Sequence, residues 1–507
     1  MKPPAAGAPF ALQVFVREFL ITGNTVFPAE EIKKITGPFE NRTITNADLE
    51  ELRERLTRLY IDHGYINSGA VIPDQKVVNG VVEIHIVEGR LTRVDVEGIR
   101  HFQPDYFVKR LELSAGTPLN VRNLEQTLQI MLQDPLIARI NAQLAPGERP
   151  GEAVLKVQVT ESSAYDFGVL VDNKLSPSLG EVRVVLQGEY RNIAGRGDVL
   201  SAELEGSEGI DSDLKLNYVV PVTVRDTAVN FFYEKAKSQV VQEPFNVLDI
   251  RGDLETYGMG VSKPFYRTPT RQVLLSASLE RRKSDSSLLG ESFSFSPGVQ
   301  NGESIVSVLR LVQDFANRQR DEVVAARSTF SFGLDAFGAT INDSGPDGRF
   351  AAWLGQFQWA HRFGERGHQL LFRLEGQVTN NPLLPLEQYS VGGLDSVRGY
   401  RTNQIVRDQG YSSSLEYRLP IFRNPVDLRN LQFAAFIDTG GARNKEGPNP
   451  DPTSLTSVGV GLVWDPSPKM HAELYVADAL DDVENPGNSI QDSGIFFRLA
   501  YHPLWAR

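Results

Sequence analysis

Val397-Arg398-Gly399-Tyr400, followed by Phe436-Ile437-Asp438-Thr439-Gly440, is the part of this 507-residue sequence that decides between the folds open to it. The first motif carries a cation and the second an anion. An arginine guanidinium can grip a carboxylate through two parallel hydrogen bonds, which fix its orientation as well as its charge. The glycines beside both groups allow close backbone packing. The motifs predict a contact between Arg398 and Asp438; the simpler alternative is a solvated loop arginine and a solvated aspartate at a strand end.

Around these motifs the sequence alternates between apolar and polar residues, as strands with two different faces do. From about Tyr165 the helical period is absent, and turns rich in Gly, Asn, Asp and Pro separate the alternating runs. The absence of intervening helices excludes a βαβ architecture. A soluble β-propeller or β-helix would show a blade-sized repeat, and none is visible. Examples of the alternating runs are Val182/Val184/Leu186/Tyr190, Leu214/Leu216/Tyr218, Val229/Phe231/Tyr233 and Leu370/Phe372/Leu374.

The last alternating run, Ile495-Phe497-Leu499-Tyr501, places four large apolar side chains on one face, as a lipid-facing strand does. No stretch approaches the roughly eighteen apolar residues of a membrane-spanning helix. Barrel strands need only about ten residues of alternating hydrophobicity, so the sequence is compatible with a membrane barrel. The formal net charge of −12 argues against nucleic-acid binding.

The first 160 residues contain an internal repeat. Ile21-Thr22-Gly23-Asn24-Thr25-Val26-Phe27 returns 75 positions later as Val96-Glu97-Gly98-Ile99-Arg100-His101-Phe102. The strand-like run at 82–88 returns at 155–161, displaced by 73. A repeat of this length predicts two copies of one small domain.

Within the first copy, the pattern predicts the order β-α-α-β-β. A strand is expected over 12–27, a helix opening at 28–32 and a second helix from Thr45, where Thr45 and Asp48 have capping-box spacing. Strands are expected over 70–78 and 81–87, joined at Asn79-Gly80, a strong hairpin signal.

The sequence contains no recognisable catalytic or metal-binding motif. The seven histidines are scattered, and none has the i, i+4 or Cys/His spacing of a zinc site. No nucleophile elbow or phosphate-binding loop occurs, so we expect no enzyme, no metal and no cofactor.

Together, the Val-Arg-Gly-Tyr and Phe-x-Asp-x-Gly motifs and the duplicated β-α-α-β-β unit resemble two-partner secretion transporters of the hemolysin and adhesin secretion type. The resemblance implies an α+β fold of periplasmic POTRA domains followed by a transmembrane antiparallel β-barrel of sixteen strands. The expected domains are an extension at 1–10, POTRA domains at 11–89 and 90–164, and the barrel at 165–507. Sixteen strands would leave about 21 residues for each strand and its loop.

The same resemblance implies a function. We expect an outer-membrane transporter that secretes a large unfolded exoprotein, of adhesin or hemolysin type, through its barrel after recognition by the POTRA domains in the periplasm. Outer-membrane lipid and the barrel assembly machinery would be further partners. Two alternatives stay open: a factor that assembles or inserts other barrels, and a passive porin or receptor.

The resemblance also assigns roles to residues. Val397, Arg398, Gly399 and Tyr400 would form a loop in the barrel lumen, and Phe436, Asp438 and Gly440 would form its partner on the barrel wall. Asn192-Ile193-Ala194-Gly195-Arg196-Gly197-Asp198 resembles the family's Asn-x-x-Gly-Arg-Gly-Asp signature and would close the first barrel hairpin; turn chemistry explains it better than integrin binding. Relatives often begin with a helix that plugs the pore, for which residues 1–9 are too short.

Substrate recognition would use a sheet edge of a POTRA domain, where an added strand forms backbone hydrogen bonds. The candidate contacts are Leu124, Leu128, Arg139 and Asn141.

Overall fold

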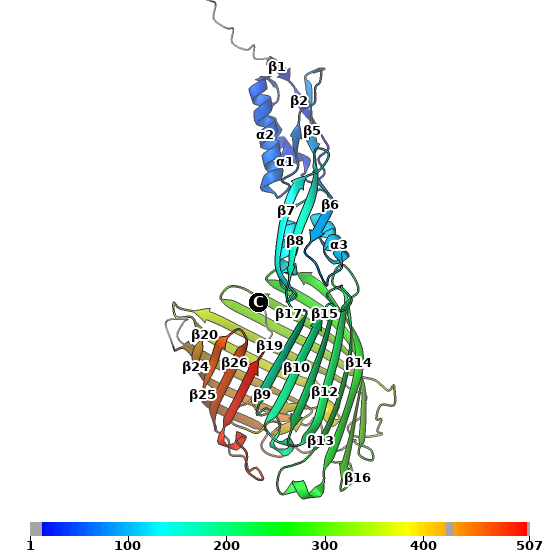
Figure 1. Ribbon diagram of the computed structural model, residues 1–507, viewed down its shortest axis with the longest axis vertical. Helices are drawn as coiled ribbons and strands as arrows, with labels where there is room; N and C mark the ends of the chain where they lie inside the picture. Colours follow the sequence, from blue (N-terminus) through cyan, green and yellow to red (C-terminus); the bar gives the residue numbers. More distant parts are fainter. Residues whose placement is uncertain (1–12, 422–429, 504–507) are drawn as a thin grey trace, which may run out of the picture. The chain divides into compact units, whose positions relative to one another are not determined.

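The computed structural model describes residues 13–421 and 430–503, and the chain forms two compact units, residues 1–162 and 163–507 (Figure 1). The extension expected at 1–10 lies outside the described residues.

The first half of the N-terminal unit contains two small sheets and two helices. β1 (Gln13–Val16) pairs with β3 (Arg42–Thr45), and β5 (Val81–Val87) lies between a parallel β2 (Glu18–Thr22) and an antiparallel β4 (Gly69–Val71). Helices α1 (Ala29–Thr36) and α2 (Asn46–Asp62) cover a core that includes Leu52, Leu56 and Tyr60; the 3-10 helix η1 (Gly37–Phe39) follows α1. The side chains and backbone N–H groups of Thr45 and Asp48 form the predicted capping box of α2.

Two expected strands of this half differ from the structure. The run predicted at 12–27 divides into β1 and β2, because the backbone N–H groups of both Arg17 and Glu18 donate to the Gly80 carbonyl and bend the chain. The strand predicted at 70–78 ends at Val71. Beyond it, the side-chain amide of Gln75 pairs with the backbone of Glu83 in place of a backbone ladder. The prediction also missed β3.

The second half of the unit repeats the first. It contains β6 (Arg90–Glu97), α3 (Pro104–Ala115), α4 (Val121–Met131), β7 (Ile137–Pro146) and β8 (Glu152–Glu161), with the sheet order β6-β8-β7. Gly23 and Gly98 both have positive φ, and a Cβ atom at either would lie 2.2 Å from a carbonyl oxygen, that of Ile86 or Val159. Among the described residues, no helix has both the length and the apolar character needed to cross a membrane.

A glutamate closes the same turn in each copy. Glu88 accepts a hydrogen bond from the backbone N–H of Thr25 at 2.7 Å, and Glu161 accepts one from the backbone N–H of Arg100 at 2.9 Å. The shared contacts explain why the sequence repeats at these positions.

The two halves meet where α2 ends and α4 begins. The N–H of Val121 donates to the Gly64 carbonyl at 2.9 Å, and the side-chain amide of Asn120 donates to the His63 carbonyl at 3.1 Å. The Arg122 guanidinium donates to the Asp62 carbonyl. The electronegative carbonyl end of α2 thus faces the N–H end of α4.

Within residues 163–421 and 430–503, sixteen antiparallel strands close into a barrel, so the expected fold is confirmed. Four residue pairs between β27 and β9 complete the closure. β16 (Glu291–Ser292) belongs to the connection between β15 and β17, which pair directly. The barrel strands are β9 (Tyr165–Asp172), β10 (Arg183–Arg191), β11 (Val199–Ser207), β12 (Ile210–Pro221), β13 (Ala228–Gln239), β14 (Arg251–Arg267), β15 (Arg271–Leu288), β17 (Glu303–Arg318), β18 (Glu322–Gly333), β19 (Ala351–Phe363), β20 (His368–Thr379), β23 (Gln409–Pro420), β24 (Leu431–Arg443), β25 (Ser454–Ser467), β26 (Met470–Ala479) and β27 (Ile495–Tyr501).

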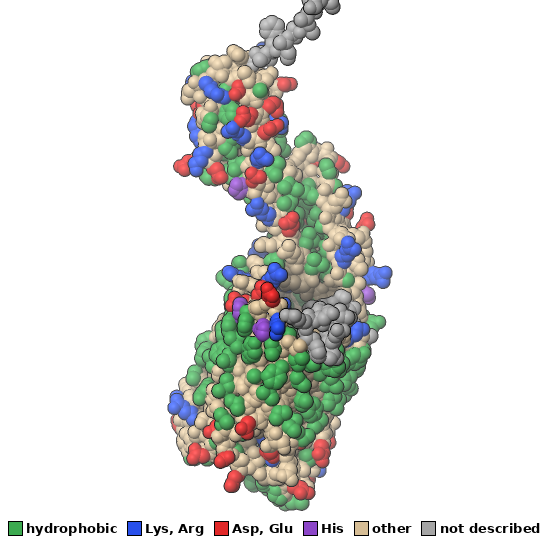
Figure 2. Space-filling model, turned by 90° about the vertical axis from the view of Figure 1, so that its left-hand side faces the viewer, with side chains coloured by type: hydrophobic (Ala, Val, Ile, Leu, Met, Phe, Trp, Pro, Cys, Tyr) green, Lys and Arg blue, Asp and Glu red, His purple; other side chains and the backbone are tan. Residues whose placement is uncertain are grey.

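Alternation along the strands separates two faces of the barrel wall. On β10 the side chains of Val184, Leu186 and Tyr190 are exposed, whereas Val185 between them is buried. On β27 Leu499 and Tyr501 are exposed, whereas Phe496 is buried. Figure 2 shows hydrophobic side chains gathered over the barrel wall, with charged groups mainly toward its ends. This apolar outer belt is what a lipid-facing wall requires.

The Asn192–Asp198 turn joins β10 to β11 and therefore closes the second barrel hairpin, whereas the sequence predicts that it closes the first. The prediction was wrong because β9 precedes β10. The Asp198 carboxylate accepts the N–H of Ala194 at 2.9 Å, and the Asn192 side chain accepts the N–H of Gly197 at 2.7 Å. The motif is therefore a turn held by its own side chains.

Candidate functional site in the barrel lumen

The site is built on the inner face of β23 and β24. Leu415 and Ile437 of these strands are exposed on the outer face, so the residues on either side of them point into the lumen. Glu416 pairs with Phe436 in the strand register, and Ser414 pairs with Asp438. This register puts two carboxylates and a hydroxyl on one inner patch.

The connection from β20 to β23, residues 380–408, enters the lumen and is called the lumen loop below. It contains the 3-10 helix η4 (Pro385–Glu387) and a short hairpin of β21 (Tyr389–Val391) and β22 (Ile405–Arg407). Tyr389, Val391, Val397, Tyr400 and Ile405 of the loop form a buried cluster with Ala442 and Leu455 of the wall. Apolar packing therefore holds the loop against β24 and β25.

Arg398 reaches the inner patch from the tip of this loop. Its Nε donates to Asp438 Oδ2 at 2.7 Å and its Nη2 donates to Asp438 Oδ1 at 2.9 Å, the two-point grip of an arginine on a carboxylate. The Arg398 backbone N–H also donates to Asp438, at 3.1 Å. Arg398 and Asp438 are 1% and 0% exposed, so water hardly screens the pair.

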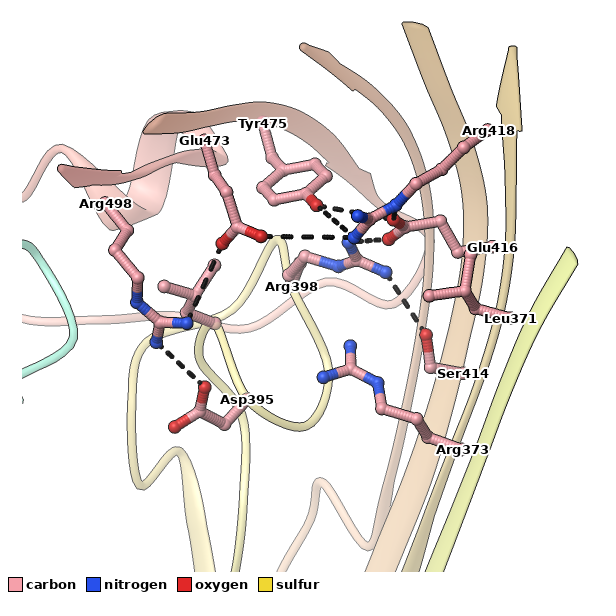
Figure 3. A pocket seen from close by; sticks show the side chains of 11 residues that line it. Leu371, Arg373, Asp395, Arg398, Ser414, Glu416, Arg418, Glu473, Tyr475 and Arg498 are labelled. Carbon is pink, nitrogen blue, oxygen red and sulfur yellow. Dashed lines mark hydrogen bonds and ion pairs between the residues drawn. The ribbon is translucent and has the colours of Figure 1, made fainter. Parts of the chain in front are cut away.

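A second carboxylate and two rings complete the surroundings of Arg398. Nη1 donates to Glu416 Oε2 at 2.6 Å, and Nη2 donates to the Ser414 hydroxyl at 3.2 Å (Figure 3). The guanidinium carbon lies 3.4 Å from the Phe436 ring centroid and 4.6 Å from that of Tyr475, which places the cation against aromatic faces.

The second carboxylate has its own cation. Arg418 Nε donates to Glu416 Oε1 at 2.6 Å, so Glu416 lies between two arginines. Beside this group is a small cavity of about 100 Å³, lined mostly by charged side chains that include Arg373, Asp395 and Glu473. Figure 3 shows Asp395 of the loop directed at Arg498 of β27, with 3.2 Å between Oδ1 and Nη2. The patch is a network of paired charges and not a solvated surface.

The other predicted motif residues lie around Arg398. The Tyr400 hydroxyl donates to the Thr456 carbonyl at 2.7 Å and accepts the N–H of Asp481 at 2.9 Å. Gly399 lies close to β25 and β26, where a Cβ atom would meet those of Ser457 and Ala477 at 3.3 Å. A Cβ atom on Gly440 would lie 3.0 Å from a Val397 methyl carbon, so glycine lets the loop approach the wall.

The sequence reasoning missed Glu416, Ser414 and Tyr475. Alternation alone places Ser414 and Glu416 on the same face of their strand. Their position opposite Asp438 depends on the register between β23 and β24, which the sequence pattern does not specify.

The predicted substrate contacts lie in the other unit. Arg139 and Asn141 are exposed on β7, an edge strand of its sheet. Leu128 is half-buried on α4. Leu124 is 4% exposed because it faces inward on α4, so its side chain is not available to a substrate. Within the described residues, no group of three or more His, Asp or Glu side chains could hold a metal ion.

Comparison with known proteins identifies two matching family models. Residues 151–464 match the family described as haemolysin secretion/activation protein ShlB/FhaC/HecB. Residues 14–89 match the POTRA domain of ShlB type.

Individual relatives span most of the chain. The outer membrane transporter CdiB of Dickeya dadantii is 23% identical over 88% of this chain and 79% of its own length. The heme/hemopexin transporter protein HuxB of Haemophilus influenzae is 21% identical over 92% of this chain and 83% of its own. The solved structure of CdiB from Escherichia coli shares the fold, with a TM-score of 0.72 at 21% identity, covering 99% of this chain and 93% of that one.

Proposed function

We propose a transport mechanism for this chain, which belongs to the haemolysin secretion/activation protein family. The members of this family are the outer-membrane transporters of two-partner secretion. The barrel lies in the outer membrane and the POTRA region lies in the periplasm. The family implies a large secreted exoprotein as the partner. The function of the family is transport, which implies no catalytic activity.

The proposed path of the exoprotein is the barrel lumen. Because β9 starts at the periplasmic end and neighbouring strands are antiparallel, the lumen loop between β20 and β23 enters from the outer end. The loop fills part of the lumen, and Arg398 holds its tip on Asp438 and Glu416. The observation that carries the proposal is this loop, fixed by a buried ion pair inside a closed barrel. An unfolded exoprotein passes through the lumen once the loop moves away from the transport path.

The proposed recognition site is the edge of β7 in the second POTRA domain, which we place at residues 90–164, after a first domain at 11–89. β7 pairs with β8 on one side and ends the sheet on the other. Such an edge can accept an extended strand by backbone hydrogen bonds. Arg139 and Asn141 would contact the substrate, with Leu128 as a weaker contact.

Outer-membrane lipid and the barrel assembly machinery are proposed as further partners. A row of stacked rings on the outer wall supports the lipid contact: Trp359 and His361 have centroids 5.8 Å apart, and His361 and Phe363 have centroids 6.1 Å apart. Aromatic girdles of this kind lie at the membrane interfaces of barrels.

The test of the proposal is secretion in a bacterium that lacks a two-partner system. Producing this chain together with a candidate exoprotein should release the exoprotein into the medium, and an unfolded N-terminal exoprotein fragment should bind residues 1–164. Ion conduction without exoprotein release would instead indicate a porin. Loss of other barrels on deletion of this chain would indicate an assembly factor.

A further inference from the structure

The lumen loop has a second attachment, far from Arg398 along the loop and on another part of the wall. Leu383 and Leu384 of the loop pack with Val306 and Val308 of β17 and with Phe350, and all five side chains are buried. The loop therefore starts after β20, reaches the wall at β17, and then runs to β24 before it rejoins the barrel at β23. Between these two attachments, on β17 and on β24, the loop passes through the lumen.

Glu387 lies where the loop leaves the wall near β17. Its Oε1 accepts Nη1 of Arg282 from β15 and Nη2 of Arg310 from β17, each at 2.8 Å. Nη1 of Arg282 also donates to the Leu386 carbonyl at 2.7 Å. One carboxylate thus joins the loop to two neighbouring wall strands.

The wall holds both arginines in place for this contact. Arg310 Nε donates to Glu280 Oε2 at 3.0 Å, and its Nη1 donates to the Ser331 hydroxyl at 2.7 Å. The side-chain amide of Gln377, on the wall strand β20, also donates to the Glu387 backbone carbonyl at 2.9 Å. The Glu387 side chain is 6% exposed, and its partners are about one-fifth exposed.

We propose that Glu387 is a second positioning residue of the lumen loop, which fixes where the loop starts to cross the lumen and so keeps the loop closed over the transport path. The inference rests on the proposed role of the loop in closing that path. It adds to the Arg398 contact a separate attachment on β15 and β17, outside both sequence motifs. Loss of the Glu387 charge weakens the attachment of this end of the crossing segment to β15 and β17.

Ion current through the purified full-length chain in planar lipid bilayers with KCl tests this inference. Glu387→Gln keeps the size of the side chain but removes its charge, and the mean current should rise. Glu387→Asp should restore part of the low current. The matched control is Glu365→Gln, an exposed glutamate in the turn between β19 and β20, which should leave the current unchanged. A Glu387→Gln barrel that folds and conducts like the wild type overturns the proposal.

A covalent replacement separates positioning from general damage, and the absence of native cysteine makes it selective. The pair Glu387→Cys with Arg310→Cys should conduct more than the wild type. Bridging the two thiols with a short, cleavable bifunctional reagent should lower the current, and reducing the bridge should raise it again. A current that does not respond to the bridge contradicts the inference. Because the currents need no exoprotein, a failure of exoprotein secretion would reject the proposed function and leave this result standing.

Discussion

At the scale of single residues, Arg398 and Asp438 explain why two short motifs identify this protein. Both side chains are buried, and the guanidinium makes two hydrogen bonds to one carboxylate. Removing one partner of a buried ion pair leaves an uncompensated charge, which costs about 3–5 kcal/mol when burial is complete. Substitution of either residue alone is therefore expected to destabilise the attachment of the loop to β24.

We predict that Arg398→Ala and Asp438→Ala each strongly reduce exoprotein secretion, and that the double variant is no worse than the more damaging single variant. Arg398→Lys should also function poorly, because an ammonium group cannot form the planar two-point contact. Secretion into the medium, at matched barrel levels in the membrane, measures the effect. Losses that simply add would show that the two residues act independently.

A further prediction concerns Glu416, which the sequence did not reveal. Glu416→Gln leaves Arg398 its contact with Asp438 but removes the carboxylate charge that lies between Arg398 and Arg418. Secretion should fall less than with Asp438→Ala. A loss equal to that of Asp438→Ala would mean that the two carboxylates are equivalent partners.

The sequence predicted the Arg398–Asp438 pair because both residues stand in compact motifs. Glu416 and Tyr475 carry no such signal, because they become neighbours of Arg398 only through the pairing of strands that the pattern does not specify. Leu124 shows the opposite error: the sequence predicts it as a substrate contact, yet its side chain is buried, as an apolar residue at a helical period usually is.

At the scale of elements, β7 tests the proposed recognition of the exoprotein. We predict that Asn141→Pro abolishes binding of an unfolded exoprotein fragment, because proline cannot donate a backbone hydrogen bond and disturbs an edge strand. Asn141→Ala, which keeps the backbone N–H, is the matched control and should bind. Circular dichroism of both variants verifies the fold. Unchanged binding by a folded proline variant would exclude this part of the edge.

The turn closed by Glu161 gives a pH-dependent prediction. Burial raises the pKa of the Glu161 carboxyl, but hydrogen bonds from the Arg100 N–H and from His101 outweigh it and hold the pKa below its usual value of 4.5. A lowered pKa in the folded state means that the stabilisation is present above the usual value and is lost as the pH falls through the folded-state pKa. Stability of residues 1–164 should therefore decline on acidification.

Glu161→Gln should lower the free energy of unfolding by about 1–3 kcal/mol at neutral pH, because the bonds to a charged acceptor are weakened. The difference from the wild type should shrink in acid. Urea unfolding of residues 1–164 at several pH values measures it, with Glu125→Gln on the exposed face of α4 as the control. A difference that does not change with pH would show that the carboxylate charge does not contribute.

Element types were more predictable than element limits. The capping box of α2 and the Asn79-Gly80 turn are local, so their residues specify them. The division of the first strand at Arg17 depends on Gly80, more than sixty residues away, which no local pattern contains. The sixteen strands of the barrel came from family resemblance, since alternation does not fix where one strand stops and the next begins.

At the scale of the whole molecule, the two units bury their apolar side chains in opposite ways. The N-terminal unit encloses its own cores, with Leu52, Leu56 and Tyr60 each 0% exposed. The barrel instead exposes large side chains such as Phe231, Leu415 and Leu499 on its outer wall. An exposed apolar belt of this kind is stable in lipid or detergent and associates in water.

We therefore predict that residues 1–164 fold alone in water as a monomer with a mixed helix and strand spectrum, whereas residues 165–507 need detergent to remain dispersed and to show a β spectrum. The reason lies in the change near Tyr165 from segments that bury one face to strands whose outer face stays apolar. Each fragment is purified with and without detergent and compared by circular dichroism and gel filtration. The detergent-treated C-terminal fragment serves as the control for its water-treated counterpart. A C-terminal fragment that is soluble, monomeric and folded in plain buffer would contradict the membrane barrel, because its exposed apolar wall would then have to be covered by the protein itself.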